Sequence, residues 1–310
     1  MDQAALVTGA NGFIGRHLVQ QLLDSGWRVG GIVHRSRGHA LALLSSGDIF
    51  ETPRTTEEAM EIVEKFRPDA IFHLAAATAV EGPGDVDGLL TANFMLGAML
   101  MEAACGSPAK PSFLMAGSFW EFGTGPSYAP NTLYAATKHC LFDLLVYFRA
   151  RRDLRALSLV LFDTYGPDDP RDKIWNRILN AEAGSRVAMT RGEQLVELVH
   201  VRDVVSAFTL AAGLLAAGQP AESAYAVRSR APASLRDTVE AICETTGRRP
   251  ILEWGALPYR ETEIFTPWSG PLLPGWAPQV TLEAGIGELL RMKDRGAGLT
   301  IHRGPDLSAT

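Results

Sequence analysis

Short apolar runs and amphipathic stretches alternate along the first half of the chain. The apolar runs, which are typical of buried strands, occupy residues 4–9, 27–34, 69–76, 111–118 and 154–166. Between them, apolar positions recur at helical spacing over residues 15–26, 55–68, 86–105 and 134–152. Strands that alternate with helices predict an α/β fold, a Rossmann doubly wound parallel sheet with helices on both faces.

The alternation stops after residue 166. Pro, Gly and Trp become frequent, and helical patterns at residues 234–247 and 280–296 occur without regular strands between them. We expect an NAD(P)-binding Rossmann domain over residues 1–165 and a smaller C-terminal α/β substrate lobe over residues 166–310, with segments that can interleave. This lobe should close over the carboxyl edge of the sheet, where open α/β sheets bind ligands.

Composition narrows the classes of function. The 310 residues are 46% hydrophobic, which suits one large domain or two unequal ones, and the net charge of -6 gives no general attraction for nucleic acid or anionic membrane. Three distant cysteines without CxxC spacing predict neither a disulfide framework nor a metal site, and favour the cytoplasm. No signal peptide is expected, and the longest apolar run, at residues 206–218, is shorter than the roughly 20 residues of a membrane span.

The first predicted strand leads directly into the glycine-rich stretch TGANGFIG. Its three glycines form a GxxGxxG pattern, which supplies a tight turn, a close approach of the backbone to phosphate, and close packing of helix on strand. The helix N-terminus offers free N–H groups and partial positive charge to a pyrophosphate. A purely structural turn is the alternative. We predict a dinucleotide site that comprises Gly9, Asn11, Gly12, Phe13, Ile14 and Gly15.

The end of the second predicted strand indicates which dinucleotide is bound. NAD sites usually place an acid there for the ribose 2′-hydroxyl, but no acid occurs between Trp27 and Ala40. His34, Arg35 and Arg37 stand where a 2′-phosphate would lie, and arginine binds phosphate through a planar fork of donors. We therefore predict that NADP(H) is preferred over NAD(H), against the alternative of a basic solvated loop.

Tyr134 and Lys138 are four residues apart and therefore share one face of a helix. A free tyrosine titrates near pH 10, and a nearby cation favours the phenolate, so we expect Lys138 to lower the pKa of Tyr134. Ser118, at the end of the strand 111–118, would add a hydroxyl donor to the same substrate oxygen. Each residue alone is commonplace, but their joint occurrence behind a cofactor loop predicts acid–base catalysis at a carbonyl.

The order and spacing of TGANGFIG, FHLAA, Ser118, the Tyr134–Lys138 pair, DTYGP and HVRDV resemble the extended short-chain dehydrogenase/reductases, the NAD-dependent epimerase/dehydratase family, over nearly the whole chain. The resemblance implies that Tyr134 is the general acid/base, Lys138 its electrostatic partner and a cofactor ligand, and Ser118 the donor to the sugar oxygen. It also implies that His73 has a packing position and that the second lobe binds a nucleotide diphosphate. The further cofactor residues that it implies are Asp48, Ile49, Leu74, Ala75, Ala76 and Asn93.

Two departures from the sequence motifs of this family narrow the range of reactions that the chain is expected to catalyse. Sugar 4,6-dehydratases carry an Asp–Glu pair directly after the hydroxyl residue, whereas Phe119 and Trp120 stand here and cannot move a proton, so dehydration is disfavoured. Glu121 comes one position late and is expected to point elsewhere on the strand.

Typical epimerases read FNVYGP where this chain reads FDTYGP, and carry a diphosphate-binding arginine where Val196 stands. Arg171 and Lys173 are the candidate phosphate contacts instead, with a hydrated helix start as the alternative. This combination resembles CDP-abequose synthase-like 4-ketosugar reductases most. The expected substrate-binding residues are Val80, Phe119, Trp120, Asp163, Arg171 and Lys173.

Three functions follow from these expectations. The first is an NADPH-dependent reductase of a 4-keto nucleotide-diphosphate sugar in deoxysugar biosynthesis. The second is an NAD-dependent nucleotide-sugar 4-epimerase, which would oxidise and re-reduce one carbon. The third is a dinucleotide-sensing protein without turnover. We also expect a homodimer through a four-helix bundle, formed by the apolar stretches at residues 93–104 and 140–148.

Overall fold

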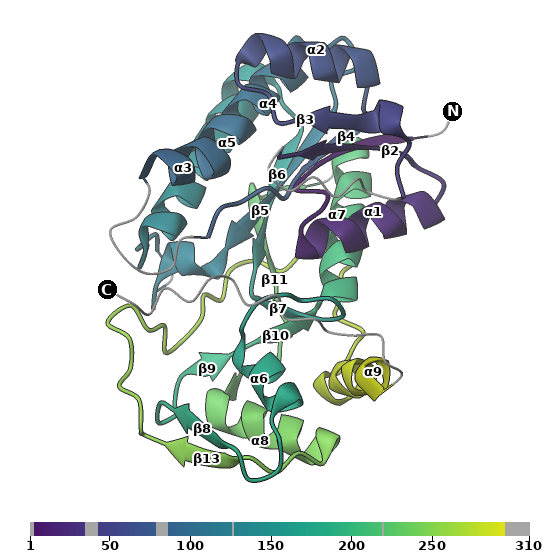
Figure 1. The fold of residues 1–310 in the computed structure, drawn as a ribbon. Helices are drawn as coiled ribbons and strands as arrows, with labels where there is room; N and C mark the ends of the chain where they lie inside the picture. The colour runs from purple at the N-terminus through teal and green to yellow at the C-terminus, as the bar shows by residue number, and fades with distance from the viewer. Residues whose placement is uncertain (1–2, 35–42, 79–85, 126, 219, 295–310) are drawn as a thin grey trace.

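A seven-stranded parallel sheet organises the molecule (Figure 1). The computed structural model describes residues 3–34, 43–78, 86–125, 127–218 and 220–294. From one edge of the sheet to the other, the strands are β11 (Ala224–Val227), β6 (Ala156–Leu161), β5 (Ser112–Ser118), β4 (Ala70–His73), β1 (Ala4–Thr8), β2 (Arg28–Val33) and β3 (Ile49–Glu51). This arrangement confirms the expected Rossmann-type α/β fold.

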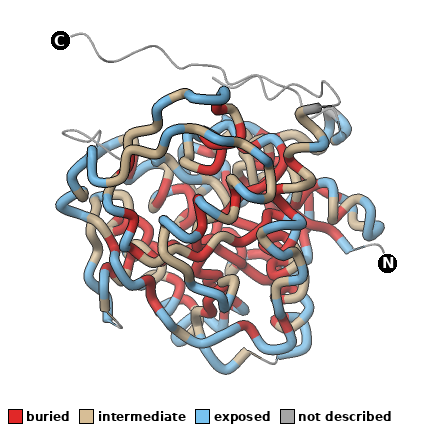
Figure 2. Tube along the Cα trace, turned by 90° about the horizontal axis from the view of Figure 1, so that it is seen from below, coloured by how far each residue is buried: buried red, intermediate tan, exposed pale blue. Residues whose placement is uncertain are grey.

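Helices cover both faces of the sheet. On one face lie α1 (Phe13–Asp24) and α7 (Val201–Ala216), and on the other lie α2 (Thr56–Phe66), α4 (Leu96–Gly106) and α5 (Leu133–Arg152). In β1, Ala5 and Val7 pack into the core with α1 and α7, whereas Ala4 and Leu6 pack with the other three helices. Buried residues therefore run through the sheet on both sides (Figure 2), which explains why its strands are apolar without alternation.

The strand order reverses between β1 and β4. The chain moves outward from β1 through β2 to β3 and then returns to β4, which pairs with β1 on the other side. Such a reversal leaves a crevice outside the carboxyl ends of the two strands, and ligands of open α/β sheets bind there.

The second lobe contains short strands that the sequence pattern did not predict, except at residues 163–165, which lie within the strand expected over residues 154–166. They pair as β7 (Asp163–Tyr165) with β10 (Leu198–His200), β9 (Leu195–Val196) with β12 (Ala233–Ser234), and β8 (Arg186–Met189) with β13 (Ile251–Trp254). The lobe has its own core, to which α6 (Ile174–Asn180), α8 (Leu235–Thr246) and α9 (Leu282–Asp294) contribute. Between these parts, α7 and β11 return to the main sheet (Figure 1). The domain boundary at residue 165 remains a prediction, and any such division has to interleave these segments.

One helical stretch, Val86–Gly106, is long and apolar enough to pass a test for membrane spans. It consists of α3 (Val86–Leu90), the π-helical turn η3 (Thr91–Met95) and α4. Half of its most apolar window is buried inside the fold, where Met99, Leu100 and Ala103 pack into the sheet core. Packing on the sheet therefore accounts for the apolar character of this stretch.

Candidate active site

The turn between β1 and α1 is built on glycine geometry. Gly9 has a φ of 65°, and its N–H donates to the carbonyl of Ile32 on the neighbouring strand. A Cβ on Gly9 would lie 2.9 Å from the amide nitrogen of Ala75, and one on Gly15 would lie 2.1 Å from the carbonyl oxygen of Gly9. The turn therefore lies against the segment that leaves β4, and α1 lies against the turn.

The first turn of α1 fits a pyrophosphate. Gly12 is the N-cap and makes no side-chain cap, and no acid lies in the first turn of this 12-residue helix. The first intrahelical bond runs from the N–H of Arg16 to the carbonyl of Gly12, so the N–H groups of the preceding helical residues have no acceptor within the helix. These donors and the helix dipole suit the dianionic bridge of a dinucleotide.

A threonine hydroxyl ties the ends of β1 and β4 together. Thr8 Oγ1 accepts hydrogen bonds from the N–H groups of Leu74 (3.1 Å) and Ala75 (3.0 Å). Its own proton points to Nδ1 of His73, 3.0 Å away, because the two amides already donate to the oxygen. Burial, with the charge of Lys138, lowers the pKa of His73 to about 3. His73 is thus a neutral, packed residue, as the resemblance implied.

Asn93 lies in the π-helical turn and is buried. Its side-chain oxygen accepts from the N–H of Ala77 (2.8 Å), and its amide donates to the carbonyl of Ala77 (3.0 Å) and to Oγ1 of Thr137 (3.1 Å). Asn93 therefore fastens the segment after β4 to α5, and this segment carries Ala75 and Ala76. π-helical turns recur at functional sites.

Asp48 and Ile49 lie where the chain enters β3. Ile49 begins β3 and pairs with Gly31, and Asp48 lies 3.7 Å from Arg28, the first residue of β2. Gly31 is the fourth of the six residues of β2, and the expected place of Asp48 and Ile49 at the adenine remains a prediction. His34 directly follows β2 and is exposed, whereas Arg35, Arg37 and Val80 lie outside the described residues.

The structure brings Ser118, Tyr134 and Lys138 together at the carboxyl edge of the sheet. Ser118 ends β5, while Tyr134 and Lys138 lie in the first turns of α5, which begins after the N-cap Thr132. A side-chain hydrogen bond joins Ser118 to Tyr134, and Lys138 is buried with 1% of its surface exposed. A phenol, a hydroxyl and an amine at one point can polarise a carbonyl and protonate its oxygen.

The pKa of Tyr134 is raised, whereas the sequence predicted a lowered value. Burial and the charge of Glu121 raise it to about 12, although the hydrogen bond from Ser118 and the charge of Arg171 act in the opposite direction. Burial lowers the pKa of Lys138 to about 8, and Glu121 partly offsets that shift. Both shifts oppose a preformed pair of ammonium and phenolate: in the free protein the phenol keeps its proton over the range in which the amine is charged.

Glu121 is the functional-site residue that the sequence interpretation missed. The expectation that its side chain points away is wrong, because the chain after Ser118 turns into the short helix η4 (Phe119–Phe122) instead of continuing as a strand. Glu121 is 2% exposed, and its Oε1 accepts from the N–H of Ser118 at 2.7 Å. A serine followed three residues later by glutamate is a capping box, and this spacing could have revealed the turn.

A cleft of about 310 Å³ opens beside this group of residues. Four of the six residues expected to bind substrate line it, namely Phe119, Trp120, Asp163 and Lys173. Within it, Lys173 Nζ lies 3.5 Å from Oδ1 of Asp163.

Arg171 lies against the glycine turn. Its guanidinium donates to both carboxylate oxygens of Asp169, at 2.7 and 2.8 Å, and lies 5.0 Å from the ring centre of Phe13. It also lies close enough to Tyr134 to act on the pKa of the phenol. Arg171 therefore stands between the cofactor loop and the reacting group.

Three polar side-chain atoms in the walls of the cleft have no partner in the part of the chain that the structure describes. They are Oδ1 of Asn131, Nε1 of Trp175 and Oε1 of Gln194. Buried polar groups are normally hydrogen-bonded, so these two acceptors and one donor are available to a polar ligand. Sequence reasoning did not identify Asn131 or Gln194, because nothing in the pattern indicates that their side chains face one cleft.

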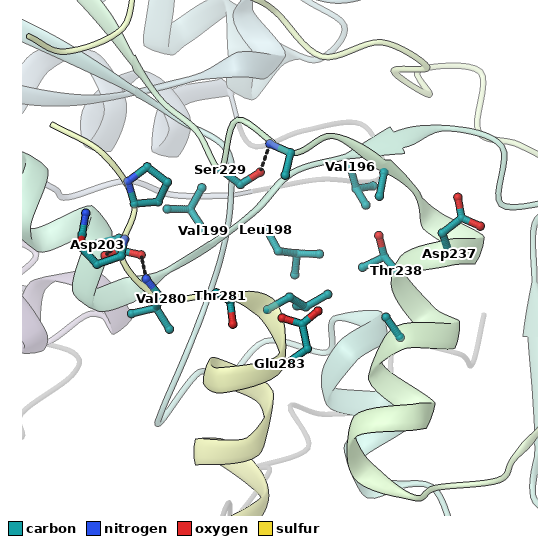
Figure 3. Close-up of a pocket in the computed structure, with 16 residues that line it drawn as sticks. Val196, Leu198, Val199, Asp203, Ser229, Asp237, Thr238, Val280, Thr281 and Glu283 are labelled. Atoms are coloured by element: carbon teal, nitrogen blue, oxygen red, sulfur yellow. Dashed lines mark hydrogen bonds between the residues drawn. The ribbon is translucent and has the colours of Figure 1, made fainter.

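A second cavity of about 490 Å³ lies in the second lobe, among β10, α8 and α9 (Figure 3). Asp203 lines it, but its carboxylate accepts the N–H groups of Gln279 and Val280, both at 3.0 Å. None of Ser118, Tyr134 and Lys138 lines this cavity. We therefore assign the candidate active site to the smaller cleft, because Phe119 and Trp120, which directly follow Ser118, line it.

Comparison with known proteins identifies the family of this chain. A family model described as "NAD dependent epimerase/dehydratase family" matches residues 5–226. The chain is 30% identical to a UDP-glucose 4-epimerase of Mycolicibacterium smegmatis, over 91% of this chain and 96% of that protein. It is 29% identical to a CDP-abequose synthase of Salmonella typhimurium, over 94% of this chain and 98% of that protein.

Solved structures give the same result. The UDP-glucose 4-epimerase of Thermus thermophilus, in complex with NAD, matches 96% of this chain and 100% of its own, with a TM-score of 0.78 at 24% identity. MoeE5 in complex with UDP-glucuronic acid and NAD matches 94% of this chain and 99% of its own, with a TM-score of 0.76 at 26% identity.

Proposed function

The chain belongs to the NAD-dependent epimerase/dehydratase family, and from this premise we propose that it is a cytoplasmic NADPH-dependent reductase of a 4-keto nucleotide-diphosphate sugar. As an extended short-chain dehydrogenase/reductase it is a nucleotide-sugar oxidoreductase or epimerase. The observation that carries the finer proposal is that Phe119 and Trp120, which cannot exchange protons, line the substrate cleft directly after Ser118.

In the proposed reaction the carbonyl at C4 becomes a hydroxyl. The dinucleotide, held by the glycine turn and the first turn of α1, supplies the hydride when it is bound. The Ser118 hydroxyl donates a hydrogen bond to the carbonyl oxygen, and Tyr134 transfers its phenolic proton to that oxygen as the carbon is reduced. The phenolate then regains a proton from solvent, which balances the step. Lys138 stabilises the phenolate and binds the cofactor ribose.

The cleft can accommodate the rest of the substrate. Lys173 and Arg171 are the proposed partners of the diphosphate, since Lys173 lines the cleft and Arg171 lies close enough to Tyr134 to act on the phenol. The unpartnered atoms of Trp175 and Gln194 would hydrogen-bond the base or the sugar.

A 4-epimerase is the second candidate, and the 30% identity to a UDP-glucose 4-epimerase favours it. One observation weighs toward the reductase: no acid occurs between Trp27 and Ala40 to bind the ribose 2′-hydroxyl of NAD.

The deciding experiment follows the absorbance of NADPH with CDP-, UDP- and dTDP-linked 4-keto-6-deoxysugars. Stoichiometric oxidation of NADPH with formation of the 4-hydroxy sugar is expected. Conversion of UDP-glucose to UDP-galactose by protein that retains NAD, with no net consumption of cofactor, would instead establish the epimerase.

The basic segment after β2 gives a prediction about cofactor choice. Replacing Arg35 and Arg37 together by serine should weaken NADPH binding about ten- to hundredfold, because charge-assisted hydrogen bonds to the 2′-phosphate are lost. Binding of NADH, which lacks this phosphate, should be unchanged and serves as the control. The Kd values are measured by nicotinamide fluorescence, and an equal loss for both cofactors would contradict NADP preference.

The proposed homodimer would form through the apolar stretches at residues 93–104 and 140–148, which belong to η3, α4 and α5, together with the neighbouring α3. Val86, Leu90, Met95 and Val146 expose apolar side chains there. We expect light scattering to give the mass of a dimer, and Met95→Lys combined with Val146→Lys to give a monomer with an unchanged circular dichroism spectrum. A monomeric mass for the unaltered protein would contradict the proposal.

A further inference from the structure

Asp169 is a buried carboxylate in the loop between β7 and α6, and the proposed reaction leaves it without a role. Its side chain is 0% exposed and does not line the cleft. Three N–H groups of Arg171 donate to it: the backbone N–H (3.2 Å) and Nε (2.7 Å) to Oδ1, and Nη2 (2.8 Å) to Oδ2. No other residue that the structure describes donates to this carboxylate. Asp169 therefore acts on its surroundings through Arg171, whose side chain is 40% exposed.

The loop that carries these two residues is fastened on two sides. On the side of the cofactor helix α1, Nε2 of His17 donates to the carbonyl of Pro167 at 2.9 Å. On the side of the cleft, the buried amide of Asn176 in α6 donates to the carbonyls of Arg171 (2.9 Å) and Asp169 (3.4 Å). The backbone around Asp169 is thus held in place, so its carboxylate is a fixed acceptor for the arginine.

The fork between Arg171 and Asp169 sets the orientation of the guanidinium. Nε and Nη2 donate to the two carboxylate oxygens, and Nη2 also donates to the carbonyl of Thr164. The guanidinium carbon lies 5.0 Å from the ring centre of Phe13, the first residue of α1. Nη1 has no hydrogen-bond partner within the described part of the chain. Arginine has five N–H donors, so the two on Nη1 remain for a ligand.

We propose that Asp169 is a positioning residue, which holds the Arg171 guanidinium in one orientation so that its Nη1 group donates to the diphosphate of the nucleotide sugar. Lys173, two residues further along the chain, lines the cleft and supplies a second positive charge. A donor group that is oriented before binding loses less conformational entropy when the ligand arrives, and this raises affinity. The identity of the ligand rests on the proposed function. The positioning itself is the same whether the sugar is reduced or epimerised.

The test removes one carboxylate oxygen and keeps the size of the side chain. In Asp169→Asn the amide oxygen can accept one N–H of the guanidinium, but the amide nitrogen is a donor and cannot replace the second oxygen. CDP, UDP and dTDP are titrated by isothermal titration calorimetry. We expect the Kd of each nucleotide that binds the unaltered protein to rise about tenfold, as for the loss of a charge-assisted hydrogen bond. Asp168→Asn is the control: this neighbour is exposed, and asparagine also adopts its φ of 60°.

A cycle of variants separates positioning from a general loss of structure. Arg171→Met should weaken binding directly, and the addition of Asp169→Asn to it should cause no further loss, because Asp169 acts through the arginine. In kinetic assays, Asp169→Asn should raise KM for the nucleotide sugar and change kcat little. A further loss in the double variant as large as that in Asp169→Asn alone would overturn the inference. Unchanged binding of the nucleotides by a folded Asp169→Asn protein would do the same.

A second variant decides if Asp169→Asn does not fold. Arg171→Lys keeps the positive charge but cannot form the planar fork, so we expect a loss of about tenfold in affinity for the same nucleotides. Normal binding by Arg171→Lys would overturn the inference, and so would an unaltered protein that binds none of the three nucleotides. By contrast, an unaltered protein that binds one of them and oxidises no NADPH with any 4-keto sugar would remove the proposed reductase and leave the role of Asp169 in place.

Discussion

Replacing Tyr134 by phenylalanine should lower kcat for carbonyl reduction about a thousandfold. The substitution removes the phenolic proton and keeps the ring, which packs against Trp120. Positioned general acids contribute about 10² to 10⁴ in rate, and the phenol is the group that hydrogen-bonds to Ser118 at the edge of the sheet. KM for the nucleotide sugar and the Kd for NADPH should change little. Steady-state assays and fluorescence titration measure these quantities.

The matched control is Tyr147→Phe, an exposed position on the same helix, which should retain full activity. If Tyr134→Phe retains the activity of the unaltered protein, another group protonates the substrate and the proposed mechanism fails. If Tyr134→Phe changes nothing in the organism while the dinucleotide still binds, a sensing role without turnover is favoured.

Replacing Gly15 by alanine should abolish dinucleotide binding at micromolar cofactor and destabilise the fold. The new Cβ would lie 2.1 Å from the carbonyl oxygen of Gly9, and both atoms belong to backbone that cannot rotate away. Relief requires α1 to move from the turn, which displaces the N–H groups that would bind the pyrophosphate. Overpacking of this kind costs about 1–3 kcal/mol, so a lowered Tm should accompany the loss of binding.

Gly213→Ala provides the control for this change. Gly213 lies within α7, and nothing lies within 4 Å of the Cβ that alanine would add. Alanine is favoured over glycine in a helix interior by about 1 kcal/mol, so this variant should be slightly more stable and bind NADPH normally. Normal NADPH binding by Gly15→Ala would show that α1 can move away from the turn without loss of the dinucleotide site. This result would contradict the steric argument.

The main sheet could be predicted from the sequence because its strands are buried on both faces and its helices are amphipathic. The first feature leaves continuous apolar runs, as in β1 and β5, and the second leaves apolar positions at helical spacing, as in α2. β3 has three residues and β11 has four, which is too short for any period to appear. The return of α7 and β11 to the sheet depends on contacts between segments far apart in the chain, and local patterns carry no information about these.

The candidate site, like the fold, could be predicted only in part. Ser118, Tyr134 and Lys138 could be found because their spacing combines with a strand end and a helix face. The position of Glu121 could not be read from strand alternation, because the chain leaves the strand at Ser118. The raised pKa of Tyr134 depends on burial and on Glu121, whereas the sequence offered only the neighbouring amine.

The position of β11 constrains how the protein can be made. This strand forms one edge of the sheet by pairing with β6, yet about 60 residues, which include part of the second lobe and α7, are synthesised between the two. While the chain emerges from the ribosome, one edge of β6 stays unpaired, and unpaired strand edges promote association with other chains. Truncations that end before residue 224 should therefore accumulate as aggregates, although every residue that holds the cofactor and the phenol is already present.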